Sequence, residues 1–429
     1  MTILVAGGGI AGLTFALTCH QVGLPVTVFE QVDAVRPLGV GINLQPNAVR
    51  ELVEMGLGDR LEAIGIRTRE VAYFSKRGRK IWAEPRGLEA GYGWPQYSVH
   101  RGKLQMLLIE AVRERLGADA IVTGRKAVGF ETEADGATLH LSDRSGARSS
   151  YSGSLVVGAD GIHSAIRAQM NPAEGPPVWG GAVLWRATSL GRPFLTGATM
   201  AMAGHEWQKF VTYPISAADP ETGLALVNWI AELKRKPDAA WNREDWNRPG
   251  RLEDFLPSFE DWRFDWLDIP ALIRSAAEVF EYPMVDRNPL ENWRAGRVSL
   301  IGDAAHAMYP IGSNGASQAI LDARVLGKCL VANGPTEAAL VAYEDERRPA
   351  TTRIVIANRG NGPDQIMQYV EEVCGGEFER ITDVMSMQEL EDHARRYKEL
   401  VGIDRERLNQ RPPFIQPTDR AADTGAKTR

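Results

Sequence analysis

A glycine-rich turn between an apolar run and a helical segment constrains the fold of this chain more than any other feature. The apolar run at residues 3–6 leads into G-G-G-I-A-G at residues 7–12, and an apolar helical pattern follows. A second apolar run at residues 26–29 ends in Glu30. The order of strand, tight turn, helix, strand and acid is that of a dinucleotide-binding βαβ unit. We therefore predict a Rossmann-like domain that includes these residues.

The parts of this motif have separate physical roles. Gly7 permits the tight turn, Gly9 lets a pyrophosphate approach the backbone, and Gly12 lets the helix and the strand pack closely. The free N–H groups and the positive dipole end at the helix N-terminus attract the diphosphate. Glu30 follows at about the distance where a carboxylate accepts hydrogen bonds from a ribose hydroxyl. A glycine-rich turn in another kind of α/β protein is the alternative interpretation.

Composition and charge limit the class of protein. The chain has 429 residues, of which 44% are hydrophobic and 24% charged, as in ordinary globular domains. Its net charge of −6 speaks against a nucleic-acid surface. Its 3 cysteines lie far apart, without the spacing of a disulfide framework or a cysteine-rich metal site. We expect a cytoplasmic monomer or homodimer with no metal, no nucleic-acid partner and no membrane segment.

Two more apolar runs end in glycine turns far from the first one. Residues 155–158 lead into Ala159-Asp160-Gly161, and residues 297–301 lead into Gly302-Asp303-Ala304-Ala305-His306. An acid at the end of a strand, as at Asp303, can bind a polyol such as the ribityl chain of a flavin. The helix that starts near Gly315 would direct its positive dipole end at the flavin edge that becomes negative on reduction.

The texture of the sequence changes between residues 176 and 285. Strand-like runs alternate there with loops rich in Pro and Asp, and 8 of the 11 tryptophans fall in this region. They are Trp179, Trp185, Trp207, Trp229, Trp241, Trp246, Trp262 and Trp266. We predict an antiparallel sheet with a wide aromatic face that binds a flat apolar ligand. Ordinary core packing is the alternative for any single tryptophan.

The three separated motifs resemble those of the single-component FAD-dependent aromatic hydroxylases, the para-hydroxybenzoate hydroxylase superfamily. The resemblance covers most of residues 1–360, and Ser164 and Arg167 belong to its second motif. Within the superfamily the chain is most similar to the phenazine-1-carboxylate hydroxylases of pyocyanin biosynthesis. The segments that carry this likeness are RPLGVGINLQPNAV (36–49), PQYSVHRGKLQM (95–106), YPMVDRNPL (282–290) and MYPIGSNGASQAILD (308–322).

The resemblance implies an α/β fold in which two domains are interleaved. A Rossmann-like FAD-binding domain is expected at residues 1–70, 99–175 and 286–360, and an antiparallel substrate-binding sheet at 71–98 and 176–285. Helical patterns are predicted at residues 47–55, 103–116, 316–333, 337–360 and 363–401. Residues 361–410 form a C-terminal helical segment in this prediction, and residues 411–429 a disordered tail.

The resemblance also implies tightly but non-covalently bound FAD, with NADH or NADPH as a transient co-substrate and O₂ as the oxidant. The expected FAD-binding residues are Gly7, Gly9, Ile10, Ala11, Gly12, Glu30, Gln31, Arg36, Gly41, Arg101, Asp160, Asp303, Pro310, Gly312, Gly315, Ala316 and Ser317. Many relatives have Asn where this chain has Ser317, so a main-chain contact to the flavin is the one expected there. No later glycine motif of the G-x-G-x-x-G type follows a strand, so NAD(P)H is expected to bind without a Rossmann domain of its own.

The implied chemistry is that of the cofactor. NAD(P)H reduces FAD, O₂ adds at C4a, and the distal oxygen of the hydroperoxide passes to an electron-rich ring in a site that excludes water. The residues expected at the reacting end are Trp185, Arg186, Tyr213, Tyr309 and Pro310, with Trp229, Tyr282 and His306 as further substrate contacts. Arg186 could pair with a substrate carboxylate, and a surface or salt-bridged arginine is the alternative. For His306, a structural role within the G-D-A-A-H motif is the alternative to a substrate contact.

Other functions are compatible with parts of this pattern. A salicylate-type benzoate hydroxylase is the main alternative among enzymes, and a binding-only flavoprotein is the alternative outside them. The binding-only protein would hold FAD without substrate-stimulated NAD(P)H oxidation. A flavin-dependent halogenase would be expected to show W-x-W-x-I-P, which the sequence lacks. A membrane-bound epoxidase would need an apolar C-terminal anchor, whereas the residues after 411 are polar.

Overall fold

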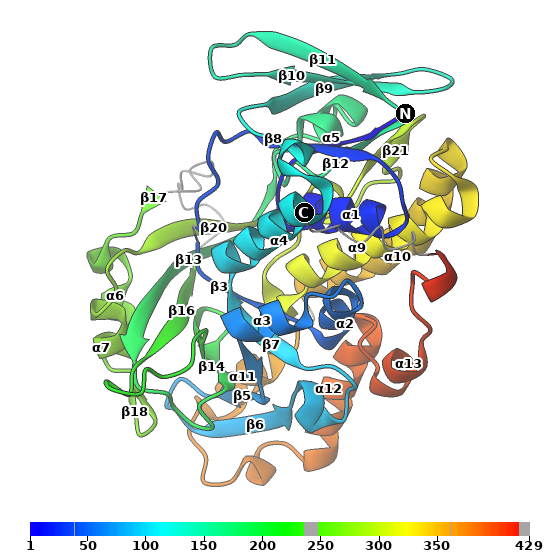
Figure 1. Ribbon diagram of the computed structural model, residues 1–429. Helices are drawn as coiled ribbons and strands as arrows, with labels where there is room; N and C mark the ends of the chain where they lie inside the picture. The colour runs from blue at the N-terminus through cyan, green and yellow to red at the C-terminus, as the bar shows by residue number, and fades with distance from the viewer. Residues whose placement is uncertain (38, 236–247, 361, 420–429) are drawn as a thin grey trace.

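The predicted βαβ unit is present in the computed structural model, which describes residues 1–37, 39–235, 248–360 and 362–419 (Figure 1). It consists of β1 (Ile3–Ala6), α1 (Ile10–Gln21) and β2 (Val26–Phe29). The two strands pair in parallel, with Ile3 opposite Val26 and Ala6 opposite Phe29. Parallel neighbours need a crossover connection, and α1 supplies it.

A six-stranded sheet brings the three glycine turns together. Its order is β21-β22-β12-β1-β2-β8, and every neighbouring pair is parallel except β21 with β22. The added strands are β8 (Ile121–Val122), β12 (Leu155–Gly158), β21 (Arg294–Ala295) and β22 (Val298–Leu300). The turns that follow these strands are joined by backbone hydrogen bonds, from Ala159 N to Ala6 O at 2.7 Å and from Ile301 N to Gly158 O at 2.9 Å. The three motifs therefore lie side by side at one sheet edge.

Helices enclose this sheet and bury one large apolar core. The helices of this part of the fold are α2 (Pro46–Glu54), α3 (Gly58–Ile64), α4 (Arg101–Leu116), α5 (Ala165–Met170), α9 (Gly315–Asn333) and α10 (Glu337–Asn358). Helix α9 packs against α1, α2 and α10, and it is buried over most of its length. The helices predicted at 47–55, 103–116, 316–333 and 337–360 are therefore present, with ends that differ by one or two residues. No helix in the described parts of the chain is long and apolar enough to cross a membrane.

Two small antiparallel sheets flank the six-stranded one. The first consists of β9 (Lys126–Thr132), β10 (Ala137–Ser142) and β11 (Arg148–Gly153). The second has β7 (Gln96–His100) between β3 (Gly41–Leu44) and β4 (Gly65–Thr68). Gly41 N donates to the Asn228 side chain at 2.7 Å, so the second small sheet is held against the large sheet described next.

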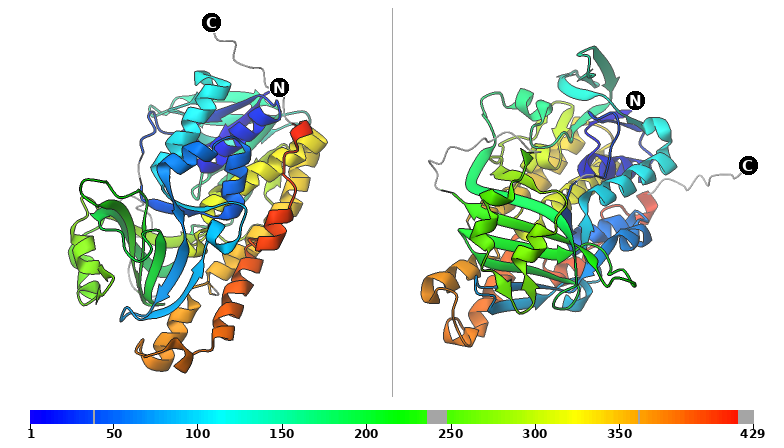
Figure 2. Two further views of the ribbon diagram at one scale, coloured as in Figure 1. Left: turned by 60° about the horizontal axis from the view of Figure 1, so that its bottom comes forward. Right: turned by 90° about the vertical axis from the view of Figure 1, so that its left-hand side faces the viewer.

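An eight-stranded sheet forms the second half of the molecule, shown in green and blue in Figure 2. Its order is β17-β20-β13-β16-β15-β14-β5-β6, with only β14 and β5 parallel. The strands are β5 (Glu70–Phe74), β6 (Lys80–Pro85), β13 (Val178–Gly191), β14 (Thr199–His205), β15 (Gln208–Pro214), β16 (Ala225–Lys234), β17 (Arg248–Pro249) and β20 (Phe280–Asp286). Strands from residues 70–85 and 178–286 thus share one sheet, which confirms the predicted fold class of a Rossmann-like part interleaved with a largely antiparallel sheet.

Most tryptophans of the region 176–285 lie on the outer face of this sheet, not on a ligand-binding face, namely Trp179, Trp185, Trp229, Trp262 and Trp266. Short helices α6 (Leu256–Phe259) and α7 (Ile269–Arg274) and the β18 (Arg263–Phe264) to β19 (Leu267–Asp268) hairpin cover the outer face. Trp185 and Trp229 are 0% exposed and pack there, with Trp185 stacked on Phe255 at 4.9 Å between ring centroids. The predicted aromatic ligand-binding face is therefore wrong for these five tryptophans, whereas Trp207 is 47% exposed and Trp241 and Trp246 lie outside the described residues. Side chains alternate along a strand, so the other face carries different residues.

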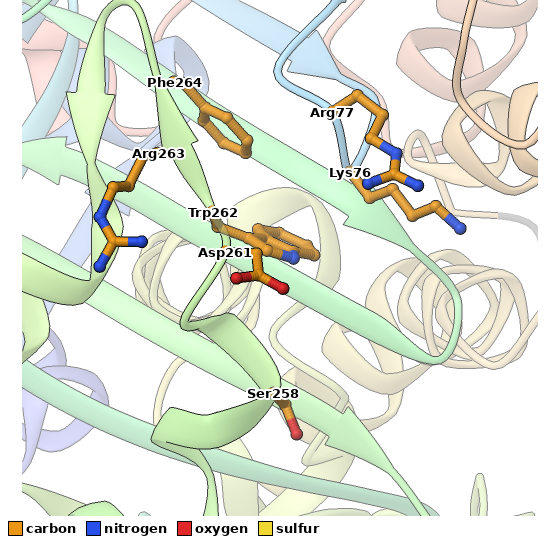
Figure 3. A pocket seen from close by; sticks show the side chains of 7 residues that line it. All are labelled: Lys76, Arg77, Ser258, Asp261, Trp262, Arg263 and Phe264. Carbon is orange, nitrogen blue, oxygen red and sulfur yellow. The ribbon is translucent and has the colours of Figure 1, made fainter.

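The C-terminal segment consists of three helices instead of one long pattern. They are α11 (Gln365–Cys374), α12 (Met387–Leu400) and α13 (Arg405–Gln410). Gly375 and Gly376 both have positive φ values, 62° and 81°, and end α11. The basic turn at residues 75–80 meets this segment, because Lys76 pairs with Glu371 and Arg77 with Glu377. A polar hollow of about 300 Å³ beside the turn is shown in Figure 3.

The tail predicted from residue 411 is ordered as far as the structure describes it. Arg411 pairs with buried Glu51 at 2.5 Å and lies over the Phe414 ring at 3.7 Å. Ile415 is 0% exposed and packs toward α9 at Gly327. The prediction of a disordered tail is therefore wrong for 411–419. These residues are held by one buried isoleucine and one ion pair, and such isolated contacts produce no periodic pattern in the sequence. Residues 420–429 lie outside the description.

Replacing Ile415 by alanine should lower the stability of the whole protein. A buried Ile→Ala change typically costs about 2–5 kcal/mol, because apolar contacts are lost and a cavity remains. The measurement is the thermal unfolding midpoint of the purified protein. The matched control is Ile356→Ala, at a position that is 58% exposed in α10, where the expected change is within about 0.5 kcal/mol. Equal midpoints for both variants would contradict the packing of residues 411–419.

Candidate functional site

A large cavity joins the edge of the parallel sheet to the inner face of the eight-stranded sheet. Its volume is about 1060 Å³. One end is lined by the three glycine turns, and the other by two or three alternating residues from each of β13, β14, β15 and β16. The hollow of Figure 3 shares no lining residue with it. The cavity is therefore the place where the predicted cofactor and substrate residues can meet.

The first glycine turn leaves room for a ligand at one position and none at another. A Cβ atom added to Gly9 would meet no protein atom within 4 Å, and Gly9 lines the cavity. A Cβ atom added to Gly12 would lie 2.1 Å from the Gly7 carbonyl oxygen. Helix α1 has no side-chain cap, so its first N–H groups are available to an anion. These features fit the diphosphate of FAD at Gly9 and close packing at Gly12.

Glu30 is held in place at the next position along this edge. Its carboxylate accepts hydrogen bonds from Gly8 N at 2.8 Å and from Val32 N at 3.0 Å, and it lines the cavity. Two oxygens offer further lone pairs, so a ribose hydroxyl can also be accepted. Gln105 was not predicted, and its side chain donates to the Gly8 carbonyl at 2.9 Å. Its only sequence signal is its place one turn into α4.

Four more predicted FAD residues line this end of the cavity, namely Ile10, Ala11, Gln31 and Arg36. Arg101 lines it too, and its guanidinium lies close to Gly39. An arginine at the first position of α4 adds positive charge where a diphosphate would bind. The donor set therefore fits the polar part of FAD, although the individual contacts stay predictions.

Asp160 and Asp303, the acids of the other two turns, differ in whether their carboxylate oxygens already accept hydrogen bonds. Asp160 accepts hydrogen bonds from Ser164 Oγ at 2.5 Å and from Ala165 N at 2.8 Å, so it caps α5. Asp303 starts α8 (Asp303–His306) and is exposed to the cavity, without a hydrogen bond from any described residue. Burial within the walls raises the pKa of Asp303, and His306 and Arg101 act against this rise. Asp303 is thus the acid that is free to bind a polyol.

The loop after this motif is held by side chains from α10 and α12. Pro310, Gly312, Gly315 and Ala316 line the cavity. Asn358 donates to the carbonyls of Tyr309 at 3.1 Å and Ile311 at 3.2 Å, and Asn314 donates to the Tyr397 hydroxyl at 2.7 Å. Asn358 and Tyr397 were not predicted, because no local pattern shows which polar residues reach a loop far away in sequence.

Several predicted residues lie close to the cavity but do not line it. Ser317 Oγ accepts a hydrogen bond from Gln45 N at 3.0 Å and is fully buried. Tyr309 is buried with its hydroxyl near Gly180, and burial raises its pKa to about 12. His306 Nε2 pairs with Asp322 at 2.5 Å, and Asp322 also accepts from Gly302 N. The substrate contacts predicted for Tyr309 and His306 are therefore replaced by packing and by support of the glycine turn.

Trp185 and Trp229 are corrected for a different reason. Both side chains point away from the cavity into the outer core, where Trp185 donates to Glu281 at 2.9 Å and Trp229 to Ser189 at 2.9 Å. Their strand neighbours occupy the inner face instead. The sequence placed these strands correctly but did not show which of the two faces was covered by helices.

The substrate end of the cavity has mostly apolar walls. The lining side chains are Leu184, Met200, Met202, Val211, Tyr213, Ile230, Phe280 and Tyr282. Burial raises the pKa of Tyr213 to about 12, with Arg186 and Asn43 acting against the rise. The Tyr213 phenol therefore stays protonated at neutral pH. A flat apolar ring fits such walls better than a polar ligand does.

Arg186 is the one cation on this inner face whose charge lacks a carboxylate partner among the described residues. Its Nη2 donates to the Gly41 carbonyl at 3.0 Å, and its buried Nε has no hydrogen-bond partner there. Burial lowers its pKa, but a guanidinium remains charged in proteins. The arginine therefore presents an uncompensated positive charge to the cavity.

The sequence matches the FAD binding domain family over residues 1–236 and 270–358. The protein belongs to this family. It is 46% identical to a phenazine 1,6-dicarboxylic acid hydroxylase of Lysobacter antibioticus, over 83% of this chain and 89% of that protein. It is 32% identical to a 3-amino-4-hydroxybenzoate 2-monooxygenase of Streptomyces platensis, over 89% of this chain and 94% of that protein.

Solved structures share the fold. A salicylate hydroxylase substrate complex has a TM-score of 0.71 at 23% identity, covering 96% of this chain and 98% of that one. Klebsiella pneumoniae HpxO, solved with FAD and uric acid, has a TM-score of 0.68 at 24% identity and covers 95% of both chains. With the family match and the relatives above, this chain is an FAD-dependent aromatic monooxygenase that uses NAD(P)H and O₂.

Gly12→Val should prevent the protein from retaining FAD. The new side chain would push against the Gly7 carbonyl and force the helix from the strand, because the Cβ atom alone would lie 2.1 Å from that oxygen. The measurement is the flavin-to-protein absorbance ratio after purification. Gly360→Val is the matched control, since a Cβ atom there meets nothing within 4 Å. A folded Gly12→Val protein that is fully yellow would contradict the assignment of the turn.

Gly9→Ala should weaken FAD binding without changing the stability of the flavin-free protein. Its Cβ atom would enter the open space of the cavity without touching protein. The unfolding midpoint of the flavin-free variant should equal that of flavin-free wild type, whereas its FAD dissociation constant should rise by about tenfold or more. An unchanged FAD affinity would show that the diphosphate does not approach this residue.

Proposed function

We propose that this enzyme hydroxylates a planar heteroaromatic carboxylate of the phenazine-1-carboxylate class. The observation that carries the proposal is Arg186, a cation without a carboxylate partner that faces an apolar cavity beside the expected flavin loop. A carboxylate on the ring would compensate this charge, and an arginine can bind it with two parallel hydrogen bonds. The named substrate of the Lysobacter relative, a phenazine dicarboxylic acid, supports the ring class.

The residues of the chain would position and shield the ring. Arg186 would hold the carboxylate, and this would turn one edge of the ring toward the loop at residues 310–315. The apolar walls at Leu184, Val211 and Ile230 would keep water from the reacting atoms. When FAD is bound, it supplies the electrons taken from NAD(P)H and the transfer of one oxygen atom of O₂ to the ring.

Two further groups fit this role. The N-terminus of α9 at Gly315 lines the cavity, so its positive dipole end can stabilise negative charge on a reduced flavin. The Tyr213 phenol remains a hydrogen-bond donor, because burial holds its pKa at about 12. It can donate to a ring nitrogen or to a carboxylate oxygen next to Arg186.

The experiment measures NADH and NADPH oxidation by the purified, FAD-loaded protein with phenazine-1-carboxylate, its N-methyl derivative or salicylate. Product mass and H₂O₂ are read in the same sample. Stimulated oxidation with a phenazine product heavier by one oxygen atom, with or without loss of CO₂, is the expected result. Productive turnover of salicylate alone would replace the proposal by the benzoate alternative. No stimulated oxidation with any ring would overturn it.

Arg186→Ala should raise KM for the carboxylated substrate by about 10- to 100-fold, which corresponds to a loss of about 1.4–2.7 kcal/mol of binding energy. Arg186→Lys should recover only part of this, since an ammonium cannot bind both carboxylate oxygens in a planar fork. The measurement is steady-state NAD(P)H oxidation with phenazine-1-carboxylate. Arg251→Ala is the control, because that arginine is 63% exposed and pairs with Glu253. Unchanged kinetics for Arg186→Ala would remove Arg186 from the site.

A further inference from the structure

A compact group of three charges lines the cavity away from Arg186, and the functions assigned so far do not use it. Lys209, Glu232 and Asp364 all line the cavity. The Lys209 ammonium pairs with Asp364 and lies 3.4 Å from Glu232 Oε1. Lys209 and Glu232 are only 6% and 7% exposed, so this is a built feature of the wall. We call these three residues, two acids around one lysine, the acidic triad.

The strand register places the strand residues of the acidic triad and Arg186 in neighbouring rows of the same face. Leu184, Glu232 and Lys209 lie directly across from one another on β13, β16 and β15. The next row on the same face contains Arg186, Ile230 and Val211.

The Arg186 side chain turns away from the acidic triad. Its Nη2 donates to the Gly41 carbonyl, and Gly41 N is bound to Asn228, which belongs to the row beyond Ile230. The guanidinium is therefore directed away from the row that contains Lys209, while Ile230 and Val211 line the cavity in the row of Arg186. A flat ligand whose carboxylate binds Arg186 would extend over these apolar residues toward the triad.

The charges of the triad do not compensate a ligand anion. Burial opposes the charge on Lys209, but Asp364 and Glu232 outweigh it and raise the Lys209 pKa, so the ammonium persists. Burial would also raise the pKa of Asp364, but Lys209 outweighs it and the pKa is lowered. Burial raises the pKa of Glu232 against the attraction of Lys209. The triad thus carries a net charge of −1 with Glu232 ionised and 0 with Glu232 protonated.

One of the two acids comes from outside the part of the chain that matches the family. The match ends at residue 358, and Asp364 lies in the turn before α11. Its carboxylate still reaches across to Lys209 on β15. The C-terminal segment therefore contributes directly to the charge of the cavity.

We propose that Lys209, Glu232 and Asp364 form a specificity-determining subsite that accepts a neutral or hydrogen-bond-donating end of the aromatic ring system and rejects a second carboxylate. The enzyme then selects monocarboxylates. This inference rests on the proposed function, because Arg186 must hold the first carboxylate. A second carboxylate at the diagonally opposite corner of the ring would lose its hydration next to Asp364. Lys209 is already paired with two acids, so it would not offset this desolvation free energy.

The first experiment compares three ligands by titrating the oxidised, FAD-loaded protein and following the flavin absorbance spectrum. The ligands are phenazine-1-carboxylate, phenazine-1,6-dicarboxylate and the 6-carboxamide of the dicarboxylate, which has the same shape but one charge less. The dicarboxylate should bind at least about tenfold more weakly than both other ligands, as expected for an added like charge in a poorly solvated site. Equal or tighter binding of the dicarboxylate would overturn the proposal.

The carboxamide separates charge from size. If the carboxamide is rejected as strongly as the dicarboxylate, the cause is shape, and the charge-based subsite is wrong. If none of the three ligands changes the flavin spectrum, the proposed function fails together with the subsite. If all three bind equally well, the proposed function stands and only the specificity proposal fails.

Asp364→Asn provides the residue-level test. It removes one negative charge while keeping the side-chain shape, so the ratio of dicarboxylate to monocarboxylate dissociation constants should fall by about fivefold or more. The control is Asp383→Asn, an exposed acid of the same C-terminal segment that pairs with Arg380. FAD content and the unfolding midpoint show whether each variant is folded. A folded Asp364→Asn protein with the wild-type ratio would overturn the role of Asp364, and the three-ligand comparison on wild type decides the proposal if the variant does not fold.

Discussion

The parallel pairing of β1, β12 and β22 is the constraint on which the rest of the site depends. Parallel neighbours end at the same sheet edge, so three turns separated by about 150 residues each in sequence are brought within hydrogen-bond distance of one another. The hydrogen bonds from Ala159 to Ala6 and from Ile301 to Gly158 continue the sheet into the turns. The backbone of the first turns at the cofactor end is therefore tied to the sheet, and side chains such as Glu30 and Asp322 add hydrogen bonds to Gly8 N and Gly302 N.

The opposite wall of the cavity follows from a second rule, the alternation of side chains along a strand. On β13, Trp185 belongs to the outer core, while Leu184 and Arg186 face the ligand space. The same division holds on β16, where Trp229 points outward and Ile230 inward. Large aromatic residues thus stabilise the sheet from behind, and smaller aliphatic residues leave a flat space in front.

Sequence reasoning succeeded where function depends on a local pattern. The roles of Gly9 and Gly12 follow from their spacing, and the open space and the tight contact at those positions agree with them. It failed where function depends on which elements meet in space. No pattern in the sequence shows that α6 and α7 cover the outer face of the sheet, so Trp185 was assigned to the ligand side.

The same limit explains the polar residues that reasoning from the sequence missed. Asn358 and Tyr397 support the loop at residues 309–315 from helices that come later in the chain, and Asp364 reaches a strand about 150 residues earlier. The order observed at 411–419 has a similar origin, since a single buried isoleucine and one ion pair produce no periodic signal. Long-range pairing of isolated residues is fixed by tertiary packing and leaves no trace in a short window.

The alternation of the large sheet has a consequence for how this enzyme can change. Because the tryptophan core and the ligand contacts use alternating positions of the same strands, one set can vary while the other is kept. A combinatorial library confined to Leu184, Met200, Met202, Val211 and Ile230 would explore new ring shapes without touching the tryptophan core. A single-residue insertion in β13 or β16 would do the reverse, because it would exchange the two faces beyond the insertion and bring tryptophans into the cavity. We therefore expect the substrate range of this fold to change readily through substitutions at cavity-facing positions. Insertions or deletions within these strands should rarely be tolerated.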